Sequence, residues 1–158
     1  MKALVLLVTH LVALALGFAL GIYFLPILIA PPAPTAADVT AVAKEQVFSG
    51  TFRRDLKGSD AFHWGEGTVS VGPRAIALAG RLAPGPDYKL YLSPEYLETK
   101  ADFLRAKPTM VRVGDVKTFE NFVVNVPEGV DPARYQAVIV WCETFSMFIT
   151  AARYRGGS

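Results

Sequence analysis

The first thirty residues form a nearly uncharged apolar run, which restricts the fold more than any other feature of the sequence. Lys2 is its only charged side chain, and Ala3 to Ala30 contains none. A helix rises about 1.5 Å per residue, so the segment from Leu11 to Ala30 alone would span roughly the 30 Å hydrocarbon core of a bilayer. Residues 1–30 are therefore predicted to be a transmembrane signal anchor.

A cleaved signal peptide is the alternative interpretation of this segment. Such a peptide needs an apolar region of about 7–15 residues followed closely by a small-x-small cleavage site. The apolar run is longer here, and the best such site, Ala41-Val42-Ala43, lies well beyond its end. An uncleaved anchor is therefore the favoured interpretation, and either outcome exports the rest of the chain.

The charges that flank the apolar run predict its orientation. Lys2 and the amino terminus precede it, and the next basic residue is Lys44. The positive-inside rule then places the N-terminus in the cytoplasm. We expect a single-pass membrane protein with its C-terminal domain on the far side of the membrane from the cytoplasm.

Three further segments follow the anchor. Residues 31–46, rich in proline and alanine, are predicted to be a linker that holds the domain a little away from the lipid, with room for a short helical turn at 36–44. Residues 47–154 are predicted to be one β domain. Residues 155–158 are predicted to be a disordered tail.

The β domain is predicted from short apolar segments that glycine and proline separate. Leu90 and Leu92 alternate with Lys89 and Tyr91, which is the period of a half-buried strand. Gly72-Pro73 separates two such segments and predicts a hairpin. Several strands with so few helical segments indicate an all-β domain, an antiparallel sandwich or barrel, with one short helix.

That one helix is predicted over 94–107. Ser93 would cap it, Pro94 suits its first position, and Pro108 would end it. Its apolar face is predicted to consist of Leu97, Ala101 and Leu104.

Composition and motifs exclude several classes of function. The net charge is only +2 and the basic residues are scattered among acidic ones, so we expect no nucleic-acid partner. The sequence contains no nucleophile elbow, phosphate-binding loop, dinucleotide fingerprint or C-x-x-C-H motif. Its two histidines are too few for a histidine-rich metal cage. We expect no hydrolytic or group-transfer activity, and whether the chain is an enzyme at all stays open.

Cys142 is the only cysteine, so no internal disulfide can form. Free cysteine is commonly a small buried hydrophobe, and in a strand its side chain would share a face with Val138 and Val140. No Lys or Arg lies nearby in the sequence to lower its pKa. The alternatives are a redox thiol, a ligand of a soft metal or haem iron, and an intermolecular disulfide. His63 is the only other soft-metal ligand candidate in the domain.

Five blocks, in order along the chain, carry a resemblance to a known family. They are SGTF (49–52), HWGEGTV (63–69), GPDYKLYL (85–92), VGDVKTFENF (113–122) and AVIVWCETFSMFITA (137–151). With these five blocks in this order, the chain resembles the DM13 family, a module of bacterial secreted or membrane proteins and of animal extracellular proteins. It departs from the family pattern at Asp115 and Thr118 and in the length of the 94–107 segment.

The resemblance implies a role in electron transfer, with Cys142 as a bare thiol or as the ligand of a prosthetic group such as haem. His63 would be a second ligand or a hydrogen-bond partner, while Trp141 would limit solvent access to the thiol. Gly85 and Asp87 would be structural supports. A redox partner protein is then expected, and the identity of the cofactor stays unknown. Resemblance to the bacterial members also implies a bacterial inner membrane, with the domain on the periplasmic or extracellular side.

A non-catalytic binding or adhesion module is the rival interpretation, in which Cys142 is only a core residue. In that case aromatic side chains would line the binding face: Tyr88, Tyr91, Tyr96, Phe103, Phe119 and Phe122.

Overall fold

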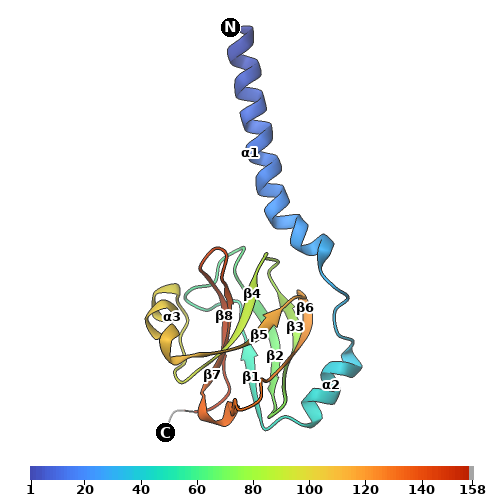
Figure 1. The fold of residues 1–158 in the computed structure, drawn as a ribbon, viewed down its shortest axis with the longest axis vertical. Helices are drawn as coiled ribbons and strands as arrows, with labels where there is room; N and C mark the ends of the chain where they lie inside the picture. Colours follow the sequence, from blue (N-terminus) through green and yellow to red (C-terminus); the bar gives the residue numbers. More distant parts are fainter. Residues whose placement is uncertain (157–158) are drawn as a thin grey trace.

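Helix α1 (Lys2–Ile29) stands on one end of a two-layer β domain in the computed structural model, which describes residues 1–156 (Figure 1). The helix is long and apolar enough to cross a membrane by length and composition, a property that signal sequences share. Pro26, within its last two turns, is the one residue of the helix that is fully buried.

The predicted linker contains a second helix, α2 (Ala36–Lys44). Thr35 Oγ1 accepts a hydrogen bond from the Asp38 N–H (3.2 Å), and the Asp38 carboxylate accepts one from the Thr35 N–H (2.8 Å). This capping box fixes the start of the helix. Val39 is buried, and Asn121 Nδ2 of the sandwich donates to the Pro34 carbonyl (3.2 Å). The linker therefore packs on the domain instead of acting as a free spacer.

Two four-stranded antiparallel sheets make up the domain, which confirms the predicted fold class. The first sheet has the order β1 (Phe48–Phe52), β2 (Gly65–Val71), β3 (Ala75–Leu82) and β6 (Glu120–Asn125). The second has the order β5 (Val111–Val116), β4 (Tyr88–Ser93), β7 (Ala137–Cys142) and β8 (Met147–Arg153). Two 3-10 turns, η1 (Lys107–Thr109) and η2 (Pro132–Arg134), lie between strands.

The short helix α3 (Lys100–Ala106) begins later than the sequence predicts. Thr99 caps it, because its hydroxyl accepts a hydrogen bond from the Asp102 N–H (3.2 Å). Ser93 instead ends strand β4, and its hydroxyl donates to the Glu95 carbonyl (2.6 Å). The predicted Ser93 cap is therefore wrong: a local turn uses that hydroxyl before a helix can form.

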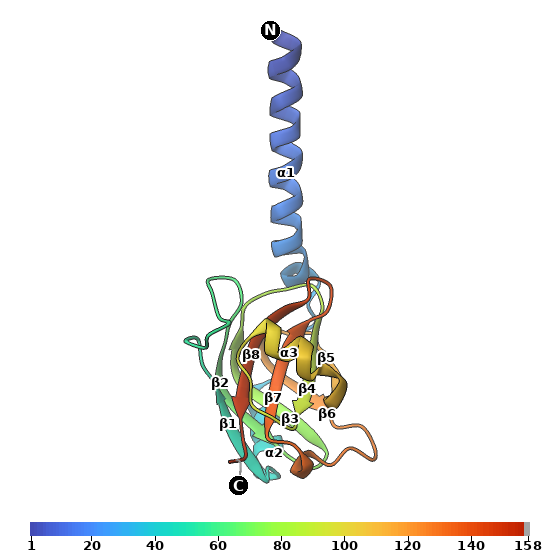
Figure 2. The ribbon, with the colours of Figure 1, turned by 90° about the vertical axis from the view of Figure 1, so that its left-hand side faces the viewer.

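The buried face of α3 also differs from the prediction. Leu97 is buried but precedes the helix, whereas Ala101 and Leu104 are exposed. Phe103 and Ala106 are the buried residues of the helix, which covers the outer face of the second sheet (Figure 2).

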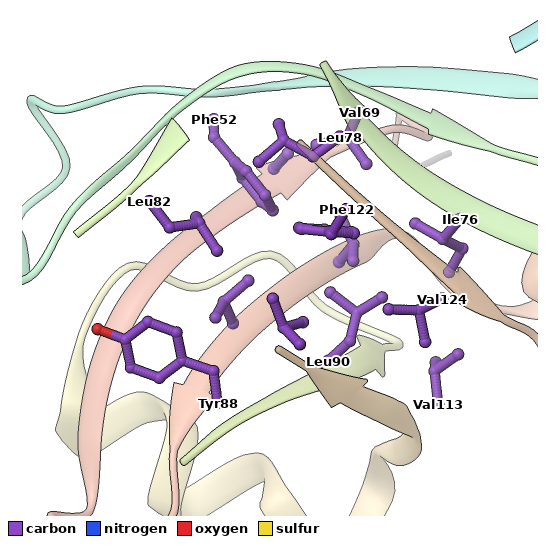
Figure 3. Close-up of a cluster of buried hydrophobic side chains, with 14 of the residues drawn as sticks. Phe52, Val69, Ile76, Leu78, Leu82, Tyr88, Leu90, Val113, Phe122 and Val124 are labelled. Carbon is purple, nitrogen blue, oxygen red and sulfur yellow. The ribbon is translucent and has the colours of Figure 1, made fainter. Parts of the chain in front are cut away.

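The main core lies between the two sheets. Phe52, Leu78 and Phe122 of the first sheet meet Leu90 and other apolar side chains of the second (Figure 3). A smaller core forms outside the second sheet, beneath α3. Strand β7 is buried on both faces because it contributes alternate residues to each core.

The end of the chain is only partly described. Arg155, in the predicted tail, still donates its backbone N–H to the Gln136 carbonyl (3.2 Å). Residues 157–158 lie outside the described residues, and with them part of the predicted tail 155–158.

Candidate functional site

A cavity of about 600 Å³ lies between the end of the sandwich and the side of α1. From the sandwich it is lined by residues within 62–63, 84–88 and 142–149, and from the helix by residues within 16–24. Its volume falls within the roughly 300–1,000 Å³ typical of small-molecule and cofactor sites. Apart from a thiol, an imidazole, two phenols and a thioether, its walls are apolar.

Cys142 ends strand β7 and forms part of the cavity wall. Its side chain joins Val138 and Val140 in the main core, as the strand period predicts, while Ile139 and Trp141 belong to the outer core. The residue is only 2 % exposed. The thiol therefore lies in the wall of the cavity, at the border of the core, and away from open solvent.

Burial raises the pKa of the Cys142 thiol. The negative charge of nearby Asp87 adds to the rise, while backbone N–H groups, foremost that of Phe145, act in the opposite direction. The neutral thiol is therefore the ordinary form near pH 7, in line with the absence of neighbouring basic residues in the sequence.

Tyr88 occupies the position opposite Cys142 in the pairing of β4 with β7 and lines the same cavity. Figure 3 shows its ring at the edge of the main core, with the hydroxyl directed away from the other labelled side chains. Burial raises the pKa of this hydroxyl, and nearby Cys142 and Tyr23 add to the rise. The sequence reasoning did not single out this residue for the thiol site.

Gly85 makes room for the Tyr88 ring. A Cβ added at Gly85 would lie 2.5 Å from Tyr88 Cε1, closer than real Cβ contacts come. A side chain at this position would therefore displace the ring that faces the thiol.

His63 lines the same cavity, so the structure brings the two predicted ligand candidates to one site. Its Nδ1 pairs with the Asp60 carboxylate at 2.8 Å, which also accepts hydrogen bonds from the backbone N–H groups of Phe62 (2.7 Å) and His63 (2.8 Å). Asp60 thereby fixes the loop and the ring, and Nε2 is the nitrogen left to interact with a ligand.

Asp87 holds the turn that follows Cys142. Its backbone carbonyl accepts from the Glu143 N–H (3.0 Å), and its carboxylate accepts from Thr144 Oγ1 (3.3 Å) and pairs with Lys89 (2.6 Å). Lys89 also pairs with Asp115 (3.0 Å), one of the two departures from the family pattern. That departure is thus accommodated by an ion pair beside the site.

Trp141 lies on the other face of the sheet from the cavity and is fully buried. Its ring stacks on Phe103, with the centroids 3.9 Å apart, and its Nε1 donates to Glu143 (3.3 Å). The Glu143 carboxylate also accepts hydrogen bonds from Lys107 (2.7 Å) and from the Tyr91 hydroxyl. Trp141 therefore supports strand β7 from outside and does not stand between the thiol and the cavity.

The donor set of the cavity suits a largely apolar cofactor more than a bare metal ion. Within residues 1–156 there is no group of three or more His, Cys, Asp or Glu side chains that could hold an ion. Cys142, His63 and Met147 supply a thiol, an imidazole and a thioether, which are the soft ligands that haem iron accepts. Met147, opposite Cys142 in the register of β7 and β8, was not predicted as a site residue.

Comparison with known proteins yields one match. A family model described as "Electron transfer DM13" matches residues 38–154, well over half of the chain. The match covers both sheets and every cavity residue outside α1. No curated protein and no solved structure matches the chain.

Proposed function

Because this chain belongs to the DM13 family of electron-transfer domains, we propose that it is a membrane-anchored electron-transfer module centred on Cys142. In this proposal α1 is the anchor, and the sandwich lies on the periplasmic or extracellular side with a redox partner protein. The observation that carries the proposal is the position of Cys142, in the wall of an apolar cavity that His63 also lines.

Of the two roles for Cys142, the geometry favours the ligand over the bare thiol. A thiol cycle ending in a disulfide needs a second sulfur, and this chain has one cysteine that is only 2 % exposed. A ligand role needs only that the thiol lose its proton when the group binds. Burial also disfavours the intermolecular disulfide, since a partner sulfur would have to enter the cavity.

In the ligand role, Cys142 would hold the prosthetic group and His63 or Met147 would be the second donor. A haem in this site would supply a one-electron couple at the iron. The protein would contribute an apolar wall that excludes water, the Tyr88 hydroxyl as a hydrogen-bond donor, and Asp60 to orient His63.

The rival function is a non-catalytic binding module, and one observation favours it: Cys142 packs with Val138 and Val140 in the main core. The aromatic residues that would line a binding face mostly fill the two cores. Tyr88 and Phe122 are in the main core, and Tyr91 and Phe103 in the outer one.

Haem titration of the full chain in detergent separates the two functions. We expect a Soret band with the wild type that Cys142→Ser abolishes and that Met147→Leu or His63→Ala shifts. Met110→Leu is the matched control, because Met110 packs on the outer core away from the cavity. No cofactor uptake, together with a thiol that labels only after unfolding, would overturn the ligand role and leave Cys142 as a core residue, as the rival function has it.

A further inference from the structure

We propose that the cavity end of the sandwich is a lipid-docking surface, in which Phe62 and Phe145 enter the bilayer that α1 spans. This surface comprises the tips of the 60–63 loop and of the β7–β8 turn, and its partner is the lipid itself. The inference rests on the proposed membrane anchoring and adds that the cavity of Cys142 is open to lipid.

Phe62 and Phe145 are large apolar side chains, yet both are exposed. Phe62 is 65 % exposed and Phe145 is 45 % exposed, and both line the cavity beside α1. They lie on separate loops, yet both loops reach the end of the sandwich on which the helix stands (Figures 1 and 2). Exposed apolar groups that gather at one place mark an interaction surface.

The contact between Tyr23 and Phe62 sets the depth of this surface in the bilayer. Their ring centroids are 6.5 Å apart, in an edge-to-face arrangement. The 28 residues of α1 measure about 42 Å at 1.5 Å per residue, close to the roughly 40–45 Å of a bilayer with its headgroups. Tyr23 lies about 9 Å before the end at Ile29, near the boundary of the hydrocarbon, where tyrosine is enriched in membrane proteins. Phe62 would therefore lie at the same depth.

The sandwich is also held close to the end of the helix. Pro26 is buried, and the linker that follows is tied to β6 by the hydrogen bond from Asn121 to Pro34. α2 then packs on the domain through Val39. A domain on a free spacer could move away from the membrane, whereas this packed linker keeps the two loop tips beside α1.

The charged groups that adjoin the surface lie outside the cavity. No Asp, Glu, Lys or Arg of the described residues lines it. Three are held in pairs: Asp60 with His63, Asp87 with Lys89, and Glu143 with Lys107 on the outer face of the sheet. Lys100, whose Nζ lies 3.8 Å from Met147 Sδ, is exposed and can keep its ammonium group in water. Insertion of the two aromatic rings therefore does not require an unpaired charge to leave water.

A consequence for the proposed function follows from this placement. The open side of the cavity faces lipid, so an apolar molecule dissolved in the membrane reaches Cys142 without crossing water. The class of ligand that suits this entrance is apolar and membrane-soluble.

The test uses the full chain in nanodiscs, with one fluorescent label at a time on an introduced cysteine in a Cys142→Ala background. The sites are Phe62→Cys, Phe145→Cys and the control Val47→Cys. Val47 is 64 % exposed, close to the 65 % of Phe62, but lies beside the β2–β3 hairpin, at the other end of the sandwich. We expect lipids that carry a quencher near the headgroup to quench the labels at 62 and 145 several-fold more than the label at 47.

A fourth label at Leu14→Cys, in the middle of α1, tests the anchor separately. Lipids that carry a quencher deep in the bilayer should quench the label at Leu14. If they do so while the labels at 62 and 145 behave like the label at 47, the anchor stands and the docking surface is overturned. If Leu14 is not quenched, the anchor fails and the docking surface fails with it. Should Cys142→Ala not fold, the same labels can be placed with Cys142→Ser.

Discussion

Tyr88 of β4 and Cys142 of β7 are partners in the antiparallel register, and both side chains line the cavity beneath α1. This pairing brings a phenol and a thiol together at the end of the sandwich, where their pKa values are both raised by burial. It gives the lone cysteine a defined polar neighbour in otherwise apolar surroundings.

The first prediction concerns the protonation of Cys142. Because burial raises its pKa in the folded state, the neutral thiol contributes stability that is fully present below the ordinary value of about 8.5. That contribution is lost as the pH rises from there through the raised pKa. We expect denaturant unfolding of the full chain in detergent to show a steeper loss of stability above about pH 8.5 for wild type than for Cys142→Ala.

In the wild type, Cys142 should react slowly with a thiol reagent at pH 7 and completely after unfolding. The other titrating groups are present in both proteins, so the difference between them reports the thiol together with its coupling to Tyr88, whose pKa Cys142 also raises. Equal pH profiles for wild type and Cys142→Ala would contradict the raised pKa.

The second prediction concerns the space that Gly85 leaves for Tyr88. In Gly85→Ala the new methyl group meets the ring, so we expect a loss of about 1–3 kcal/mol in the free energy of unfolding, as for other overpacked sites. The control is Gly156→Ala, whose Cβ would meet nothing within 4 Å. Adding Tyr88→Leu to Gly85→Ala should recover part of the loss, whereas a full additive loss would exclude contact with the ring as its cause.

Local patterns predict the strands and one face of the site well. The Gly72-Pro73 hairpin forms as expected, and the Gly72 N–H donates to the Ala75 carbonyl (2.9 Å). The period of β7 also places Cys142 correctly with Val138 and Val140. These features depend on residues that are neighbours in the sequence.

Features that depend on distant residues are not visible in the sequence. The cavity exists because β4 pairs with β7 in one particular register and because α1 packs over the loop ends. The start of α3 was missed for a different reason, since Ser93 and Thr99 are both good caps. The choice between them depends on the turn that Ser93 makes with Glu95.

The third prediction concerns the carboxylate of Glu143, behind the site. Burial alone would raise its pKa, but the hydrogen bonds from Lys107 and Tyr91 outweigh burial and lower it. The ionised form therefore contributes stability above the ordinary value of about 4.3, and this is lost as the pH falls through the lowered pKa.

Accordingly, Glu143→Gln should lower the free energy of unfolding by about 1–3 kcal/mol at pH 7, as measured by denaturant unfolding, and by less at acid pH. The matched control is Glu128→Gln, at an exposed position in the β6–η2 loop. A difference between Glu143→Gln and wild type that stays constant from pH 7 to acid pH would refute the role of the charge.

The last prediction concerns Asp60, which we expect to position His63 for the prosthetic group without touching it. In Asp60→Asn the carboxylate that holds His63 Nδ1 becomes a neutral amide, so the ring is less firmly oriented. Loss of such an outer partner typically costs about 10–100-fold in affinity for a bound group. We therefore expect weaker haem uptake and a displaced Soret maximum, with the fold retained.

Asp131→Asn is the matched control for this change. Asp131 likewise accepts a hydrogen bond from a backbone N–H two residues on, that of Ala133 (2.9 Å), but it does not line the cavity. If His63 is a ligand, His63→Ala should change the spectrum more than Asp60→Asn does, and Asp60→Asn should add little in the His63→Ala background. If Asp60→Asn lowers only stability and leaves both affinity and spectrum unchanged, Asp60 supports the loop alone and does not position His63 for the group.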